Sequence, residues 1–350
     1  MTYYFEVLPL HPPPERLESL TSYLMRLAEL NGISSMDGLS AICFPRQDRR
    51  ITREIVDYPP LSLDELTRVT TCPQAILQAT TFFHVAAKFG RSTHPQPLSR
   101  FLSGDISDFL RYCPVCLAEQ QTPHYLLSWR FLMQSCCVKH GCRLLDKCGH
   151  CNESIPLFIS PFKIGYCPLC GWDMKKGYVD LISKEELTAA LVRVQDIEFL
   201  LNSQPWEING SNTIQLIGQR LAYERRKRRL TAVKIARRTG ITLTVVEGIE
   251  RGNPMRKGAT FQGYSKYADY LRLSLRDVFN KALQEQGNTI SVALPRPACP
   301  VCQQTQYITR EGYNRSGSQR YQCRYCSHGF TAQPKVKQKG DDQKLRTESF

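Results

Sequence analysis

SCCVKHGCRLLDKCGHC, residues 135–151, holds five cysteines and two histidines within seventeen residues. Thiolates and imidazoles are the ligands that zinc prefers, and a Cys-x2-Cys turn, or knuckle, can point two thiolates at one ion. These seven side chains are too many for one ion with four ligands. The stretch therefore predicts parts of two metal sites, whose remaining ligands come from elsewhere in the chain.

Knuckles with the same spacing recur along the chain and pair into three sites. The two knuckles of a pair are separated by fifteen or twenty residues. The predicted ligands are Cys113, Cys116, Cys137 and His140 in site one, Cys148, Cys151, Cys167 and Cys170 in site two, and Cys299, Cys302, Cys323 and Cys326 in site three. Because protein would fill all four positions of each ion, we expect three structural zinc ions and no open position for catalysis.

Four cysteines are left over: Cys43, Cys72, Cys136 and Cys142. Cys142 is separated from His140 by one residue and is the main rival ligand in site one. Adjacent Cys136 and Cys137 are not expected to bind one ion together, although a change of register to Cys136 stays open. His150 lies inside a knuckle and is expected to face solvent. An iron–sulfur cluster would also accept cysteines, but paired knuckles of this kind are more often zinc sites.

The net charge of +14 is concentrated in the last third of the chain. Residues 211–281 hold sixteen Lys/Arg against five Asp/Glu, and residues 295–350 hold ten against four. These segments predict a surface for a polyanion; the alternative is a solvated basic face that only aids solubility. The nearly neutral residues 1–210 are expected to bind proteins or simply to form a folded body.

The sequence does not predict a membrane protein. It contains no run of about 18 apolar residues, and the N-terminal MTYYFEVLPLHPPPE lacks the features of a signal peptide. We therefore expect a cytoplasmic location, where fifteen cysteines favour metal binding over disulfides.

The length of the sequence suits two or three domains. Apolar periodicity and the stretches that interrupt it indicate where these domains begin and end. Apolar residues at helical spacing predict helices at 15–32 and 183–201. The expected fold is mainly α with small zinc-stabilised α+β modules. The expected boundaries are a helical and zinc-finger domain at 1–201, a linker at 202–212, a five-helix domain at 213–285, a linker at 286–298, a zinc ribbon at 299–332 and a disordered tail at 333–350.

Residues 216–282 predict five helices and resemble the repressor-type helix-turn-helix, down to the Ile-Glu-Arg-Gly at the end of the third helix. Gly240 is expected to end the second helix, and Thr242 to cap the third. In that family the third helix enters the major groove, which implies base contacts from Thr242, Leu243, Thr244, Glu247 and Gly248. This set offers no Arg, Asn or Gln for bidentate base contacts, so we expect phosphate contacts without sequence readout. The expected phosphate-binding residues are Arg220, Arg225, Arg226, Arg228, Arg229, Lys234, Arg237 and Arg238.

The segment around site three is similar to the zinc ribbon of insertion-sequence transposition proteins, especially at Gln319–Cys323 and Phe330. Its basic and aromatic side chains suit a nucleic-acid face carried on strands. They are Arg315, Arg320, Arg324, Tyr313, Tyr321 and Tyr325. A ribbon that docks a protein is the alternative.

The first 200 residues resemble the TniQ/TnsD family of proteins that select targets for transposons with heteromeric transposases. The resemblance rests on Glu18-Ser19-x3-Tyr23-Leu24-x-Arg26-Leu27-Ala28 with Asn31-Gly32, on Arg111-Tyr112-Cys113-Pro114-x-Cys116-Leu117, on Trp129, on Cys137-x2-His140-Gly141-x2-Leu144-Leu145 and on the two knuckles of site two. These pieces occur in order.

The resemblance implies an adaptor that is not an enzyme. Such an adaptor marks a target in the bacterial nucleoid and recruits TnsC, a AAA+ ATPase that brings in the transposase. Some members bind an attachment site on double-stranded DNA directly, and others ride on the CRISPR complex Cascade, whose guide RNA chooses the site. The third helix of residues 216–282 lacks side chains for bidentate base contacts, which favours the Cascade-associated adaptor. The basic residues in the C-terminal part of the chain favour direct DNA binding. A homodimer is left open.

Two other classes of function explain less of the sequence. A transcription regulator would explain residues 216–282 but not the metal sites of the front. An enzyme is not expected, because the sequence shows no carboxylate triad with a supporting motif, no Gly-rich phosphate loop and no open metal position.

Overall fold

The computed structural model describes residues 6–44, 57–60, 62–202, 213–252, 259–286, 297–303, 305, 308–313 and 319–331. Within them the chain is mainly helical and carries three cysteine-rich clusters, which confirms the expected fold class. The predicted tail at 333–350 and most of both predicted linkers lie outside the described residues. The chain divides into two compact units, Met1–Ser291 and Val292–Phe350.

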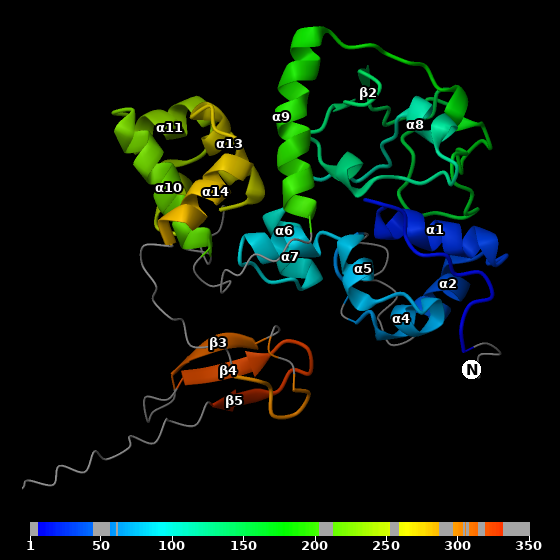
Figure 1. Cartoon of the computed structure of the whole chain (residues 1–350), viewed down its shortest axis with the longest axis horizontal. Coiled ribbons are helices and arrows are strands. Elements are labelled where there is room, and N and C mark those ends of the chain that lie inside the picture. The colour runs from blue at the N-terminus through cyan, green and yellow to red at the C-terminus, as the bar shows by residue number, and fades with distance from the viewer. Residues whose placement is uncertain are drawn as a thin grey trace, which may run out of the picture. The chain divides into compact units, whose positions relative to one another are not determined.

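The front of the first unit, residues 6–202, joins short helices to a loop-rich, cysteine-containing segment (Figure 1). Its elements are α1 (Leu20–Leu30), α2 (Met36–Cys43), α4 (Asp64–Thr70), α5 (Gln74–Ala79), α6 (Phe83–Lys88), α7 (Pro95–Phe101), α8 (Pro114–Glu119), the 3₁₀ turn η1 (Leu127–Arg130), β1 (Cys136–Cys137), β2 (Cys142–Arg143), the 3₁₀ turn η2 (Met174–Lys176) and α9 (Lys184–Leu201).

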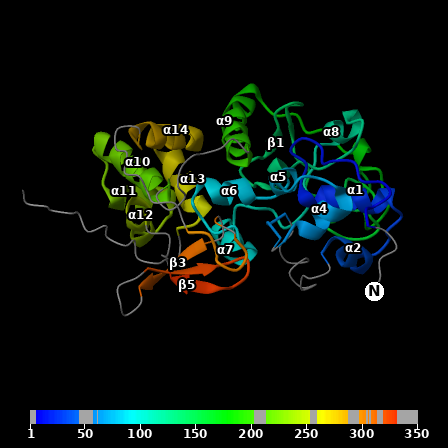
Figure 2. The same cartoon turned by 60° about the horizontal axis from the view of Figure 1, so that its bottom comes forward.

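Five helices follow, and they form one group that can be traced in both ribbon views (Figures 1 and 2). They are α10 (Thr213–Lys227), α11 (Ala232–Thr239), α12 (Leu243–Glu250), α13 (Phe261–Tyr270) and α14 (Leu275–Gln286). Gly240 ends α11 with a φ of 72°, and the Thr242 hydroxyl accepts the backbone N–H of Val245, so both predicted helix boundaries are confirmed.

The first helix begins later than the sequence pattern predicts. The pattern places a helix start at residue 15, but α1 begins at Leu20, because Ser19 is extended and its hydroxyl accepts the backbone N–H of Ser22. Just before this cap, Leu17 has a φ of 60°, in the left-handed region that an α-helix excludes. Apolar spacing alone does not locate such a break.

Two buried ion pairs brace the front. The Arg26 guanidinium donates to the Glu18 carboxylate at 2.7 Å, and the Glu18 side chain is fully buried. Arg130 pairs in the same way with Asp57, whose carboxylate also accepts the backbone N–H of Thr21 at 2.7 Å. Buried charges are tolerated only when they are paired and hydrogen-bonded, so these contacts hold distant segments in register.

A first buried cluster, core one, joins α1, α2, α4 and α5 to the cysteine-rich segment. Its largest side chains are Tyr23, Tyr112 and Trp129, each at most 2 % exposed. The buried ligand cysteines of sites one and two belong to the same cluster. The front helices therefore pack directly on the predicted metal centres.

A second buried cluster, core two, joins α6, α7, η1 and α9 to the five helices α10–α14. Phe89 is fully buried, and its ring meets those of Phe101, Phe261, Tyr264 and Phe279 edge-on, with centroids 5.0–5.8 Å apart. The five-helix group therefore shares its hydrophobic core with α6, α7, η1 and α9 of the front region.

Polar contacts reinforce this junction. The buried Asp196 on α9 accepts the backbone N–H groups of Leu275 and Arg276, at 2.9 and 3.0 Å, in the first turn of α14. The Arg91 guanidinium donates to the carbonyl oxygen of Ala259 at 2.9 Å. A carboxylate supplied by another helix thus caps α14, because the first N–H groups of a helix have no partner within it.

The second unit contains a small antiparallel sheet in the order β3-β4-β5, with bounds Ile308–Tyr313, Gln319–Cys323 and Gly329–Thr331. Among the described residues of this unit, the fully buried cluster consists of Cys299, Ile308 and Cys323. So small a core supplies little hydrophobic stabilisation, so we expect metal binding to stabilise this unit.

Candidate metal centres and candidate nucleic-acid surface

Site one is formed where α8 meets the hairpin β1–β2. Cys113 caps α8, and Cys116 lies in its first turn, so the short helix presents both sulfurs to one point. The Nδ1 atom of His140 lies 3.4 Å from Cys113 Sγ, 3.3 Å from Cys116 Sγ and 3.5 Å from Cys137 Sγ. Cys116 Sγ and Cys137 Sγ are 3.5 Å apart. Four donor atoms thus converge, and the donor atom of His140 is Nδ1.

Sites two and three gather only sulfur. In site two, Cys148 Sγ lies 3.7 Å from Cys170 Sγ, and Cys151 Sγ lies 3.9 Å from Cys167 Sγ. In site three, the sulfurs of Cys299 and Cys326, and those of Cys302 and Cys323, are 3.5 Å apart. In each of the three clusters all ligand atoms lie within 4.8 Å of one another. The structure therefore brings together all twelve residues that the spacing pairs.

Most knuckles close with the same backbone turn. The residue after the second ligand has a positive φ at Gly141, Asn152, Gly171 and Gln303. Each of these four residues donates its N–H to the carbonyl of the first ligand residue in its knuckle, at 2.8–3.0 Å. Glycine adopts this conformation without a Cβ clash, and asparagine tolerates it better than most residues. The turn reverses the chain and leaves both ligand side chains on its inner side.

The donor sets fit tetrahedral zinc. Metal–sulfur bonds of about 2.3 Å place two sulfurs about 3.8 Å apart, and a sulfur and a nitrogen about 3.6 Å apart. The sulfur separations of 3.5–3.9 Å and the sulfur–nitrogen separations of 3.3–3.5 Å agree with that geometry. All four positions come from protein in each cluster, so the chemistry of the donors is that of a structural ion.

The left-over cysteines occupy two kinds of environment. Cys43 and Cys72 are buried in core one, and burial raises the pKa of both thiols. Cys136 and Cys142 lie on the hairpin β1–β2, where Cys142 is the cross-strand partner of Cys137. Cys142 Sγ lies 3.6 Å from Cys113 Sγ, but Cys142 is not part of the four-donor cluster.

Two side chains near the metal sites give further detail. His150 is exposed and stacks on Trp172 with ring centroids 6.5 Å apart, so the expectation that it faces solvent is confirmed. Glu119, at the end of α8, was not predicted from the sequence. Its carboxylate lies 3.1 Å from Nε2 of His140, the ring nitrogen that faces away from the sulfurs. Its position three residues after Cys116 on one helix is the signal that could have found it.

The basic residues of α10 divide into two groups. Arg225 donates both ends of its guanidinium to Glu250, at 2.6 and 2.8 Å, and its side chain is 12 % exposed. Arg220 pairs with Glu224 inside the same group of helices, and Arg228 donates to the carbonyl oxygen of Leu271. These three cations make contacts within the fold. Arg228 is nevertheless exposed, and so are the other residues of the predicted set, Arg226, Arg229, Lys234, Arg237 and Arg238.

The first turn of α12 has a different character. Thr242 uses its hydroxyl as the helix cap, Leu243 is 39 % exposed, and Thr244 is exposed. Further along, Glu247 pairs with Arg251 at 3.2 Å. Within the predicted set, the exposed cations therefore lie at the end of α10, just after it and along α11, and none lies at the start of α12.

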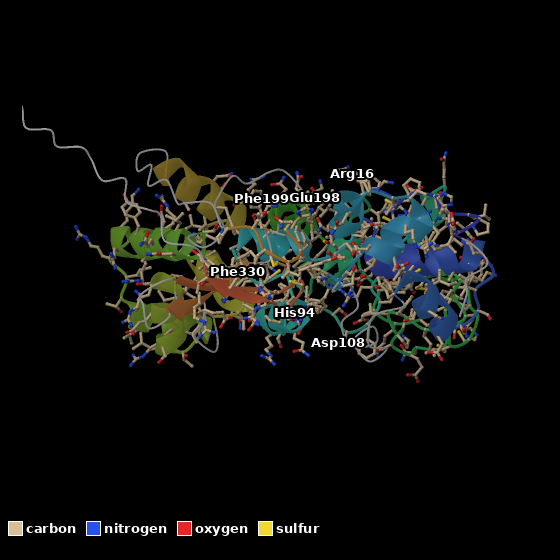
Figure 3. The ribbon with its side chains drawn as sticks, turned by 90° about the horizontal axis from the view of Figure 1, so that it is seen from below. Arg16, His94, Asp108, Glu198, Phe199 and Phe330 are labelled. Atoms are coloured by element: carbon tan, nitrogen blue, oxygen red, sulfur yellow. The ribbon has the colours of Figure 1, made fainter. Side chains whose placement is uncertain are left out.

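On the ribbon, Arg320 and Arg324 are exposed, and Arg324 pairs with Glu311 at 3.0 Å. Tyr321 and Phe330 are cross-strand partners, and their rings stack with centroids 5.6 Å apart. Figure 3 labels Phe330 on this sheet. Arg315 lies outside the described residues.

A cavity of about 780 Å³ lies within the first unit. Its walls come from the chain before α1, from α5, α6 and α9, and from the start of α14. Arg16, Glu198 and Phe199 line it and appear together in Figure 3. Burial lowers the pKa of His84, also in its wall, to about 4, so this imidazole is neutral near pH 7.

Comparison with known proteins identifies one family match. Residues 9–144 match the model of the TniQ family, whose members are transposon-associated targeting proteins. The matched range covers the elements from α1 to β2 and site one, and it ends before site two. A search of curated proteins finds no match to the chain. Among the described helices, none is both long and apolar enough to cross a membrane.

Proposed function

We propose that this chain, which carries a TniQ domain over residues 9–144, is a target-selection adaptor for a transposon with a heteromeric transposase. In this proposal it links a Cascade–guide RNA complex at the target DNA to the TnsC AAA+ ATPase. The match to the TniQ domain carries the assignment to target selection. The division of charge supports guided targeting, because the front is nearly neutral and suits protein partners.

The five-helix group supplies the nucleic-acid contact in this proposal, as a repressor-type helix-turn-helix with an altered role. Its exposed cations at the end of α10 and along α11 suit phosphates, which position a protein without specifying sequence. The start of α12 offers Thr242, Leu243 and Thr244, none of which makes a bidentate contact to a base. Base pairing by a guide RNA would supply the sequence information that this helix does not.

Zinc is the proposed metal in all three sites. It would be held by Cys113, Cys116, Cys137 and His140 in site one and by four cysteines in each of sites two and three. Each bound ion would stabilise a segment whose own hydrophobic core is small or shared. The ribbon, with exposed Arg320 and Arg324, would add a second contact to nucleic acid.

The proposal is tested by pulling the tagged full-length chain from cells that hold the whole transposable element. Recovery of Cascade subunits together with guide RNA and TnsC supports the guided adaptor. Recovery of TnsC and DNA without any Cascade subunit overturns the guided mechanism while leaving target selection intact. A footprint at a promoter with no transposition partner would favour a transcription regulator instead.

A direct attachment-site binder is the second candidate, and the exposed cations of α10 and α11 favour it. The two mechanisms differ in DNA specificity, which is measured by competition between target and scrambled DNA with the purified chain alone. Specific sites usually bind about 10³–10⁷ times tighter than random DNA. A preference of about a thousandfold that disappears when Thr242, Leu243 and Thr244 become alanine would establish the direct binder.

A further inference from the structure

Two side chains outside the donor set of site one contact its ligands. Glu119 Oε2 lies 3.1 Å from His140 Nε2, while His140 Nδ1 faces the three sulfurs. A histidine that binds a metal through one ring nitrogen carries its proton on the other, so Nε2–H donates to the Glu119 carboxylate. The His140 side chain is 12 % exposed, and the Glu119 side chain is 49 % exposed.

The position of Glu119 is fixed by its place on α8 and by a contact with Lys139. Glu119 ends α8, the helix that also carries Cys113 and Cys116, so one rigid turn supplies two ligands and the group that faces the third. The Lys139 ammonium donates to the same Oε2 atom at 2.6 Å. A carboxylate placed in this way selects the ring tautomer with a bare Nδ1 and limits rotation of the imidazole.

Cys142 contacts a different ligand of the site, Cys113. Its sulfur lies 3.6 Å from Cys113 Sγ, and the residue is completely buried. As the cross-strand partner of Cys137 on the hairpin, it is placed behind the ligands rather than among them. When Cys113 is a metal-bound thiolate it has no proton to give, so in this pair the Cys142 thiol is the donor.

We infer that Glu119 and Cys142 are positioning residues for the metal of site one: Glu119 orients His140 through Nε2, and Cys142 donates a hydrogen bond to the Cys113 thiolate. This inference rests on the proposal that site one holds a metal ion. It replaces the interpretation of Cys142 as a rival ligand, since a ligand and a hydrogen-bond donor respond differently to substitution by serine. Sites two and three use only cysteine ligands and therefore serve as internal references.

The experiment measures how many zinc ions the full-length chain retains as free zinc is lowered with a series of chelating buffers. The transition that belongs to site one is identified as the one lost in Cys116→Ser. Glu119→Ala should weaken that transition by about 10- to 100-fold, the usual effect of removing such a partner. Glu119→Gln should recover part of the loss, because its amide oxygen still accepts from Nε2–H.

For Cys142 the decisive comparison is between two variants. Cys142→Ser keeps a donor and should retain site-one zinc nearly as well as the unmodified chain, whereas Cys142→Ala should bind it more weakly. The matched control is Cys136→Ala, which removes a buried thiol from the same hairpin without removing the contact to Cys113. For Glu119 the control is Glu185→Ala, which removes an exposed carboxylate from α9 and leaves the contacts described at site one in place.

The outcomes separate the inference from the proposal beneath it. Loss of a whole zinc ion in Cys142→Ser would show that Cys142 is a ligand and would overturn its positioning role. Unchanged site-one affinity in Glu119→Ala would overturn the role of Glu119. A chain that binds zinc at sites two and three but not at site one would refute metal binding at site one itself.

Discussion

Core one and core two are held together by different means. Core one packs short helices against a segment whose backbone is mostly loop, and its buried members include the ligand cysteines Cys113, Cys116, Cys137, Cys148 and Cys167. Core two contains no predicted ligand; it joins longer helices through an aromatic cluster around Phe89. The first core should therefore depend on metal and the second on packing, although both lie in one compact unit of the chain.

This contrast shows how one chain can combine two stabilising strategies. A loop-rich segment gains little from helix formation, so a metal bound in each four-ligand cluster would add stability that regular secondary structure does not supply. The helices α10–α14 bury a continuous apolar surface and need no ion.

Metal removal should have the largest effect. Structural zinc contributes about 10–16 kcal/mol in zinc-finger peptides, more than most domains possess in total. Chelation should therefore abolish hydrogen-exchange protection in residues 135–151, while α13 and α14 stay protected. Mass-spectrometric hydrogen exchange on the full-length chain measures both. Unchanged protection at 135–151 after complete zinc loss would mean that core one does not need its metal.

Phe89→Ala should act on core two with the next largest effect. The fully buried ring contacts four other aromatic rings, so its removal should lower the free energy of unfolding by about 3–5 kcal/mol. Denaturant unfolding followed by circular dichroism measures the change, and zinc content should not change. Phe109→Ala is the control, because Phe109 is 46 % exposed; an equal loss in both variants would contradict the central place of Phe89.

Asp196→Ala should have a smaller effect at the junction. It removes the carboxylate that caps α14 from α9, and losing a helix cap usually costs about 0.5–2 kcal/mol. Exchange of the Leu275 and Arg276 amide protons should accelerate before any global loss of structure. Asp196→Asn should show a milder effect, because its amide oxygen still accepts; faster exchange only at α10 would refute the capping role.

The smallest effect should be a pH dependence at Asp105. Burial raises the pKa of this carboxyl to about 7, and its Oδ2 atom has no hydrogen-bond partner among the described residues. Between pH 4 and 7 the folded state therefore holds a proton that the unfolded state has released, so stability falls as pH rises through this window. Asp105→Asn should remove this pH-dependent loss of stability, which is on the order of 1 kcal/mol.

Thermal unfolding at pH 5 and pH 8 measures this effect. The unmodified chain should lose more stability between the two pH values than Asp105→Asn does. Asp108→Asn is the matched control, because Asp108 is exposed on the same segment. Equal pH dependence in all three proteins would exclude Asp105 as the source.

The residues of the metal sites could be predicted closely because ligand spacing is a local property. A knuckle needs only two ligands separated by two residues and a turn that reverses the chain. Both features depend on a few consecutive residues. The same holds for the ends of α11 and α12, where Gly240 and Thr242 act on their own backbone. The start of α1 was mislocated, because a cap at Ser19 competes with an apolar pattern that continues through it.

Contacts between residues that are distant in the sequence were decided by the tertiary structure alone. Charge counts identify residues 211–281 as basic, yet only packing shows that Arg225 is used by Glu250, while Arg226 is exposed. The sharing of core two between α6 and α13, and the contact of Cys142 with Cys113, likewise join residues far apart in the chain. Local spacing in the sequence determines which cysteines and histidines can form a knuckle. Packing between distant segments determines which charged side chains are exposed and which side chains contact the ligands.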